Sequence, residues 1–327
     1  MKSKIPLFFY PAQIVFIDDN PDFLASLDMV FSNEYNLKLF DNALSALEYI
    51  NAPKPATRSS HNKNAPELAG DSDKWVKKVL NHSHLKQRNN ERDMEISVVV
   101  ADFSMPSLNG IEFCKKINNP AIKKILLTGH ATPSDAVTAF NENIIHYYIK
   151  KSDENMLEQL TNAINKLQNA YFQDLTSHIK NEAVDVNTPF FADAELADYF
   201  QKVCSELDVK EYFYLSNPSR FTLQTRDGSE SLCLIYTEED IAEHLKILEE
   251  EDAPSDLIQR IASRDFIPLF NSEDGFYEPE SFNHSVNIYP AQKVTGKTNY
   301  YCAVIPQHEI CTAQPHISPV ANRGKLH

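Results

Sequence analysis

The spacing of hydrophobic residues predicts a regular alternation of strands and helices in the N-terminal half of the chain. Short apolar runs typical of strands occur at 13–17, 36–40, 96–101, 123–128 and 144–150. Segments with apolar residues at helical spacing follow these runs, at 21–34, 42–51, 110–117, 133–143 and 153–182. Asn20 suits the N-cap of the first helix, and Pro21 suits its first position.

Five strands that each lead into a helix predict an α/β fold with a doubly wound, five-stranded parallel sheet. Right-handed crossovers bring the carboxyl end of every strand to the same edge of such a sheet. Ligands of doubly wound proteins bind at that edge. We therefore expect the functional residues of this half of the chain at the strand ends.

The alternation is interrupted at 52–94, where Pro, Ser, Asn and charged residues dominate. So long an irregular stretch is uncommon inside a compact domain. The strand pattern nevertheless resumes at Ile96. We therefore interpret 52–94 as an insertion in an N-terminal domain that covers 1–152, with a long fifth helix and connector at 153–186.

The second half of the chain has a different pattern. Short strand-like runs and two helical segments follow one another without the strand-helix repeat. This pattern predicts an α+β domain at 187–306, followed by a flexible tail at 307–327. Most of the negative charge of the chain falls after Val184, so the C-terminal domain is the acidic one.

Composition narrows the possible functions. The net charge of -15 disfavours a surface that collects nucleic-acid phosphates, so direct nucleic-acid binding is not expected. Five scattered cysteines, an odd number, fit a reducing compartment better than a disulfide framework. The N-terminus does not read as a signal peptide, and no run approaches the roughly 20 apolar residues of a membrane span. A cytoplasmic protein without membrane contact is the expectation.

Three carboxylates stand at the ends of predicted strands. Asp18 and Asp19 end the first strand, and Asp102 ends the strand that begins at Ile96. If these strands are neighbours, the three carboxylates converge and repel one another. A hard cation held by oxygen ligands is the usual compensation, and Mg²⁺ fits a site with few carboxylates and retained waters.

Two further strand ends carry groups that can donate hydrogen bonds to negatively charged oxygens. Thr128 closes one strand and Lys150 closes the next. Any one polar residue at a strand end is usually just solvated, but five at one edge of one sheet form a stronger signal. A carboxylate nucleophile beside a cation, an ammonium and a hydroxyl is suited to accept a phosphoryl group.

These residues, together with the segment "DFSMPSLNG" that contains Asp102, resemble the receiver domain of two-component response regulators. The resemblance implies a flavodoxin-like fold in which a sensor histidine kinase or a phosphotransfer protein phosphorylates Asp102. It further implies that Asp18, Asp19, Asp102 and the backbone carbonyl of Ser104 hold Mg²⁺. No enzymatic activity beyond self-phosphorylation and autodephosphorylation of the receiver is implied.

The same resemblance implies a switch pair, Thr128 and Tyr147, that reports phosphorylation, with Lys150 binding the phosphoryl group. One position departs from the family pattern, because the family usually has proline after the lysine and this chain has Lys151. Over its whole length the chain is similar to a group of proteobacterial response regulators with an uncharacterised output region. That wider similarity implies a role in quorum sensing.

The fifth helix carries an apolar stripe that predicts a protein contact. Its members are Leu157, Leu160, Ile164, Leu167 and Tyr171, and the stripe continues beyond the length needed to cover a sheet. We expect a homodimer with this stripe in its interface.

The second half of the chain shows no catalytic set, so three output functions stay open. The leading interpretation is a domain that acts through protein or small-ligand contacts. The alternatives are a transcriptional regulator that binds DNA directly and a domain that binds nucleotide. The Gly-Lys-Thr at 296–298 does not support the nucleotide alternative, because Ala291 stands where a phosphate loop needs glycine.

Overall fold

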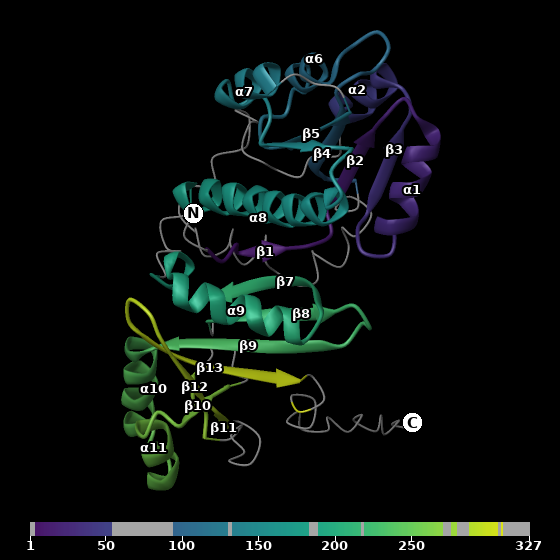
Figure 1. Ribbon diagram of the computed structural model, residues 1–327. Coiled ribbons are helices and arrows are strands. Elements are labelled where there is room, and N and C mark those ends of the chain that lie inside the picture. The colour runs from purple at the N-terminus through teal and green to yellow at the C-terminus, as the bar shows by residue number, and fades with distance from the viewer. Residues whose placement is uncertain are drawn as a thin grey trace, which may run out of the picture. The chain divides into compact units, whose positions relative to one another are not determined.

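The computed structural model describes residues 4–53, 94–129, 133–182, 189–216, 219–270, 276–279, 288–306 and 309 (Figure 1). The predicted insertion and the predicted tail lie almost wholly outside the described residues. The chain forms two compact units, of which the N-terminal unit comprises Lys4–Ala192 and the C-terminal unit begins at Asp193. No helix of the described part is long and apolar enough to cross a membrane.

The N-terminal unit contains the predicted parallel sheet. Its strands are β2 (Gln13–Ile17), β3 (Leu37–Phe40), β4 (Ile96–Asp102), β5 (Lys123–Thr128) and β6 (Tyr147–Lys150), in the order β3-β2-β4-β5-β6. The central strands β2, β4 and β5 are buried along their whole length because helices cover both faces, which explains their continuous apolar runs. The prediction of a doubly wound five-stranded sheet is therefore confirmed.

Helices on the two faces of this sheet bury separate cores. The helices are α1 (Pro21–Phe31), α2 (Ala43–Asn51), α6 (Gly110–Lys115), α7 (Pro133–Asn141) and α8 (Met156–Glu182). Residues of α2, α6 and α7 pack with Leu126 and its neighbours on one face. Residues of α1 and α8 pack with Phe16 and Ile125 on the other face. As predicted, Asn20 caps α1, and its side chain accepts hydrogen bonds from the backbone N–H groups of Asp22 and Phe23.

The apolar stripe of α8 is used inside the N-terminal unit. Leu160, Ile164 and Leu167 are buried in the core that α8 shares with α1. The hydroxyl of Tyr171 donates a hydrogen bond of 2.6 Å to Glu95, and only Leu157 is exposed, at 41%. The prediction that this stripe forms a dimer interface is therefore wrong for its four buried members, because the protomer itself already covers them.

The later turns of α8 pack against the start of the same chain. Phe8 and Phe9, which form the short strand β1 (Phe8–Phe9), and Tyr10 all contact the ring of Phe172 with centroid distances of 4.8 to 5.8 Å. The backbone N–H of Leu7 donates a hydrogen bond of 2.9 Å to the Thr176 hydroxyl. These contacts account for the length of the stripe, since an N-terminal segment covers the turns that extend beyond the sheet.

The C-terminal unit is α+β, as predicted. Its elements are α9 (Ala194–Glu206), β7 (Val209–Ser216), β8 (Ser219–Thr225), β9 (Glu230–Thr237), α10 (Glu238–Glu250), α11 (Ser255–Ala262), β10 (Phe266–Pro268), β11 (Ile288–Pro290), β12 (Gln292–Thr295) and β13 (Asn299–Pro306). Antiparallel neighbours follow the order β7-β8-β9-β13-β12, and β10 pairs with β11. Helices α10 and α11 bury the face that carries Leu234, and Phe200 of α9 packs on Phe221 of the opposite face.

The Gly-Lys-Thr segment has a structural role in this unit. Asp193 is fully buried and caps α9 by accepting a hydrogen bond from the backbone N–H of Glu195. It also accepts hydrogen bonds from the backbone N–H of Lys297, at 2.5 Å, and from the Tyr300 hydroxyl, at 3.0 Å. A Cβ atom at Gly296 would lie 2.2 Å from an Asp193 oxygen, so this glycine permits a close contact with a carboxylate.

Candidate functional site

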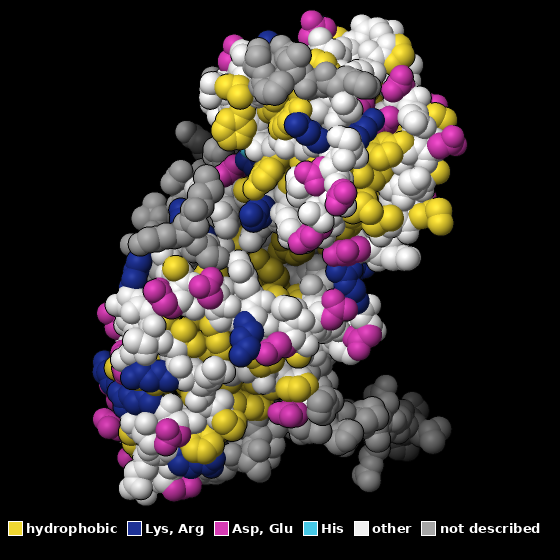
Figure 2. All heavy atoms as spheres, viewed as in Figure 1, with side chains coloured by type: hydrophobic (Ala, Val, Ile, Leu, Met, Phe, Trp, Pro, Cys, Tyr) yellow, Lys and Arg dark blue, Asp and Glu magenta, His cyan; other side chains and the backbone are white. Residues whose placement is uncertain are grey.

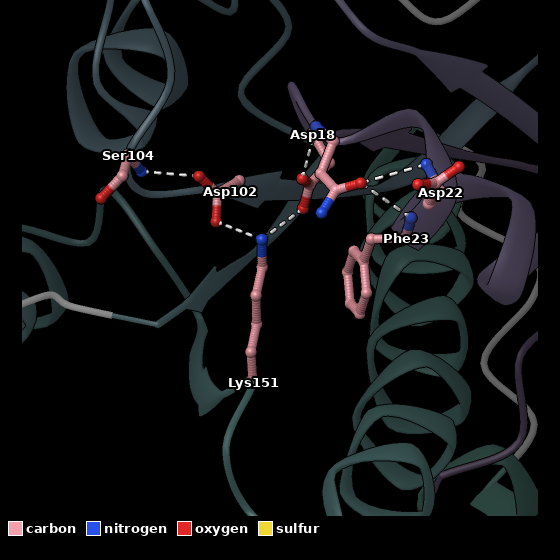
Figure 3. A network of polar contacts seen from close by, with 7 residues as sticks. Asp18, Asp22, Phe23, Asp102, Ser104 and Lys151 are labelled. Atoms are coloured by element: carbon pink, nitrogen blue, oxygen red, sulfur yellow. Dashed lines mark hydrogen bonds and ion pairs between the residues drawn. The ribbon is translucent and has the colours of Figure 1, made fainter.

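Two buried carboxylates meet at the carboxyl edge of the parallel sheet. Ile17 of β2 pairs with Ala101 of β4, so the next residues of the two strands, Asp18 and Asp102, come to lie side by side (Figure 3). Only 2% of Asp18 and 4% of Asp102 is exposed. Buried carboxylates this close together require a positive group between them.

Lys151 supplies that positive group. Its Nζ atom donates to Asp18 Oδ2 at 2.5 Å and contacts Asp102 Oδ1 at 2.7 Å. The backbone N–H of Lys151 donates to the carbonyl of Thr128, so the chain stays beside β5 for one residue beyond the end of β6. This extension places Lys151 over the two carboxylates.

Lys150, which the sequence predicts as the phosphoryl-binding lysine, does not enter the site. It is the first of two adjacent lysines, and it is exposed at the end of β6. With Lys151 on the carboxylates, the residue that stands where the resembled family has proline is Ser152.

The predicted switch aromatic also shifts by one residue. Tyr147 packs with the core on the α1 and α8 face of the sheet. Tyr148 packs with the opposite core and pairs with Leu126 of β5. Thr128, which is 1% exposed, is two residues beyond Leu126 and shares its face because strand side chains alternate. Thr128 and Tyr148, and not Tyr147, therefore share one face of the sheet.

Asp19 does not join the carboxylate pair. It is exposed, whereas Asp18 accepts a hydrogen bond of 3.1 Å from the backbone N–H of Asn20. Ser104 contacts Asp102 through its backbone N–H, which donates to Oδ2 at 2.7 Å. Within the described ranges, no three His, Cys, Asp or Glu side chains are grouped so that they could hold a metal ion. The expected convergence of three carboxylates is thus reduced to two.

The loop after Asp102 is held tightly beneath it. The backbone N–H of Gly110 donates to the carbonyl of Phe103 at 3.0 Å, which folds the loop back onto the end of β4. A Cβ atom at Gly110 would lie 2.3 Å from the Asp102 carbonyl oxygen. Ser107 adopts a φ of 73°, and Met105 is buried in the core beside α2 and α6. Gly110 of the sequence motif therefore packs against the backbone of Asp102, and Met105 anchors the loop in the core.

The ionisation of the site follows from burial and from the bridging ammonium. Burial raises the pKa of Asp18 above its ordinary value, and this effect outweighs the hydrogen bond from Lys151, which lowers it. Burial alone would lower the pKa of Lys151, but hydrogen bonds to Asp102 and Asp18 raise it above its ordinary value. The lysine is therefore held in its charged form, as an internal counter-ion for two carboxylates.

The structure adds a site residue that the sequence pattern did not distinguish. The ring centre of Phe23, in the first turn of α1, lies 4.6 Å from the Lys151 Nζ atom. In the sequence, Phe23 is one of several apolar residues at helical spacing, which predicts only a core position. Its role becomes visible when Lys151 is known to lie over the strand ends.

Part of the chain matches a known protein family, and most of the chain is similar to a solved structure. Residues 73–162 match the response regulator receiver domain family. The structure of the Legionella pneumophila response regulator LqsR superimposes with a TM-score of 0.75 and 27% identity, over 94% of this chain and 90% of that one. A receiver domain protein (CheY-like) from Methanospirillum hungatei JF-1 gives a TM-score of 0.35 and 17% identity, over 50% of this chain and 98% of that one.

One curated relative matches over a short stretch. The hydrogenase transcriptional regulatory protein HoxA of Cupriavidus necator is 36% identical over 58 residues, which are 17% of this chain and 12% of HoxA. The chain therefore spans a small fraction of the length of that relative. The parallel sheet, the paired aspartates at its edge and the family match together show that the N-terminal unit is a response regulator receiver domain.

Proposed function

We propose that this protein is a phosphorylation-controlled response regulator in which Asp102 accepts a phosphoryl group from a histidine kinase or phosphotransfer protein. The observation that carries the proposal is the buried pair of Asp18 and Asp102 bridged by the Lys151 ammonium at 2.5 and 2.7 Å. In the transfer, a carboxylate oxygen of Asp102 forms a bond to phosphorus as the bond from phosphorus to the donor nitrogen breaks. The ammonium of Lys151 stabilises the charge on the transferring oxygens.

Mg²⁺ fits the donor set that these residues present. Asp18 and Asp102 offer carboxylate oxygens, the Ser104 carbonyl lies in the adjoining loop, and Asp19, the residue after Asp18, is exposed. Mg²⁺ typically takes one or two protein carboxylates and keeps several waters, so a preformed cluster of three carboxylates is not required. When bound, the cation would neutralise negative charge on the incoming phosphoryl group.

Thr128 and Tyr148 are proposed as the residues that respond to phosphorylation. They share one face of the sheet, and Thr128 ends the strand next to β4. A hydroxyl at this edge can donate a hydrogen bond to a phosphoryl oxygen on Asp102. Tyr148 then lies on the same face as that hydroxyl.

A direct experiment tests phosphorylation. The full chain is incubated with acetyl phosphate and Mg²⁺, and its intact mass is measured. We expect the mass to rise by one phosphoryl group in the parent protein and to stay unchanged in Asp102→Asn, which keeps the size of the side chain and removes the nucleophile. An equal rise in both proteins, or none in the parent, would refute the assignment.

The output of the C-terminal unit is proposed to be protein or small-ligand contact. The net charge of -15 supports this choice over direct DNA binding. HoxA is named as a transcriptional regulatory protein, but its match covers only 17% of this chain. The similarity to LqsR over 94% of the chain supports a shared architecture for both units. A role in quorum sensing, which the resemblance of the sequence implies, is part of the same proposal.

Homodimerisation remains a proposal. The stripe on α8 cannot carry it, so the contact would have to use exposed apolar residues such as Val137 and Phe140 of α7, which are 58% and 57% exposed. Light scattering of the full chain, with and without an acyl-phosphate mimic, measures the oligomeric state.

A further inference from the structure

The ammonium of Lys151 is held from three sides. Besides the two carboxylates, the face of the Phe23 ring lies 4.6 Å away, and Figure 3 shows this ring on the Asp18 side of the ammonium. A cation over an aromatic face at this distance is attracted by the ring quadrupole, and partial burial strengthens the attraction. Phe23 therefore favours the position in which Lys151 contacts Asp18 as well as Asp102.

The backbone of Phe23 is held by the local sequence. Phe23 is the third residue of α1, and its backbone N–H donates to the side chain of the N-cap Asn20 at 3.2 Å. Asn20 in turn donates its own backbone N–H to Asp18. A single short segment thus links the carboxylate, the helix cap and the residue that carries the aromatic ring, so the cap holds the backbone of Phe23 close to Asp18.

All four oxygens of the two carboxylates have partners in this arrangement. Asp18 receives Asn20 N–H on Oδ1 and Lys151 on Oδ2, and Asp102 receives Lys151 on Oδ1 and Ser104 N–H on Oδ2. A divalent cation that binds Asp18 through Oδ2 competes with the ammonium for that oxygen, because two positive charges on one oxygen repel each other. The energy that holds Lys151 against Asp18 therefore opposes cation binding.

We propose that Phe23 is a positioning residue which keeps the Lys151 ammonium against Asp18 and thereby weakens the affinity of the receiver for Mg²⁺ in its resting state. The inference rests on the proposed function, in that Asp18 helps to hold the cation. It predicts a role for a residue that is otherwise an ordinary member of the core between α1 and α8.

Calorimetric titration of the full chain with Mg²⁺ tests this role. Phe23→Leu keeps an apolar side chain of similar size but removes the aromatic face. We expect it to bind Mg²⁺ about two- to fivefold more tightly than the parent, which is the range given by a contact of roughly 0.5–1 kcal/mol. Phe23→Met removes the ring in a second way, and Phe23→Tyr, which retains it, should restore the affinity of the parent.

Phe266→Leu provides the matched control. It removes an aromatic ring of the C-terminal unit that also lies against a cation, since the Arg260 Cζ atom is 4.3 Å from the centroid of the Phe266 ring. We expect this variant to bind Mg²⁺ like the parent. Unchanged or weaker binding by both Phe23→Leu and Phe23→Met, or no Mg²⁺ binding by the parent, would overturn the inference. A parent that binds Mg²⁺ but gains no phosphoryl mass would instead refute the proposed phosphorylation and leave the role of Phe23 standing.

Discussion

At the scale of single residues, the difference between two adjacent lysines decides the chemistry of the site. Lys150 and Lys151 have the same side chain, and both follow the same apolar strand. Only Lys151 lies over Asp18 and Asp102, because the backbone stays hydrogen-bonded to Thr128 for one further residue. The sequence predicts a lysine at this edge, but the end of the strand, which depends on pairing with β5, determines which lysine it is.

Paired substitutions of the two lysines test this placement. Lys151→Met removes the ammonium that neutralises the carboxylates, and we expect the initial rate of Asp102 phosphorylation to fall by about a hundredfold. Lys150→Met removes an exposed ammonium of the same kind and should leave the rate unchanged. Intact-mass time courses with acetyl phosphate and saturating Mg²⁺ provide the measurement. A loss of rate in Lys150→Met with normal phosphorylation of Lys151→Met would show that the placement is reversed.

At the scale of elements, the strand ends were predictable, whereas the use of the helices was not. The apolar runs of β2, β4 and β5 predict buried parallel strands, and the topology then predicts that Asp18 and Asp102 meet. The stripe on α8 predicts a contact but not its partner. That partner is the segment around Phe8 and Tyr10. Phe172 lies far from these aromatic residues in the sequence, and nothing in the local sequence around Phe8 and Tyr10 indicates that they pack against it.

A substitution in the loop between β4 and α6 tests whether this loop holds Asp102 in place. Gly110→Ala places a methyl group 2.3 Å from the Asp102 carbonyl oxygen and 2.7 Å from a Leu126 methyl group, so backbone must shift. We expect a loss of stability of about 1–3 kcal/mol, in the range for overpacked sites, together with slower phosphorylation. Urea denaturation measures the first effect.

Gly129→Ala is the matched control, because a Cβ atom at Gly129 meets nothing within 4 Å among the described residues. Its stability should stay within roughly 1 kcal/mol of the parent, as expected for a glycine to alanine change without a clash. Equal stability of the Gly110 and Gly129 variants would contradict the close contact beneath Asp102.

At the scale of the whole molecule, the two units differ in how far the sequence predicts them. The receiver combines a regular pattern with polar residues at topologically equivalent positions, so its fold and the outline of its site follow from the sequence. The C-terminal unit has antiparallel strands but no comparable set of polar residues at its strand ends. Its α+β fold class can therefore be predicted from the sequence, whereas its chemistry cannot. Its buried polar groups, such as Asp193, are instead used to hold the fold together.

One buried group of the C-terminal unit links its stability to pH. His244 of α10 is 6% exposed and lies between the rings of Tyr236, Phe270 and Phe276, with centroid distances of 5.0 to 5.7 Å. Its Nδ1 atom has no hydrogen-bond partner within the described part of the chain. Burial lowers the pKa of His244 to about 4, although the nearby Asp240 carboxylate acts in the opposite direction.

The lowered pKa makes acid destabilise this unit. The unfolded chain takes up a proton on His244 near pH 6.5, whereas the folded chain does so only near pH 4, so stability is fully present above pH 6.5 and falls as the pH drops toward 4. At pH 5 the expected loss from this residue is about 2 kcal/mol.

His244→Leu removes the titrating group. Urea denaturation at pH 7.5 and pH 5 should show a smaller difference for this variant than for the parent, by about that amount. The comparison is insensitive to any constant packing effect of leucine, because only the change with pH is used. A pH dependence equal to that of the parent would mean that His244 is protonated as readily in the folded chain as in the unfolded one. The half-buried His146 of the receiver, whose pKa is also lowered to about 4, should leave a residual pH dependence in both proteins.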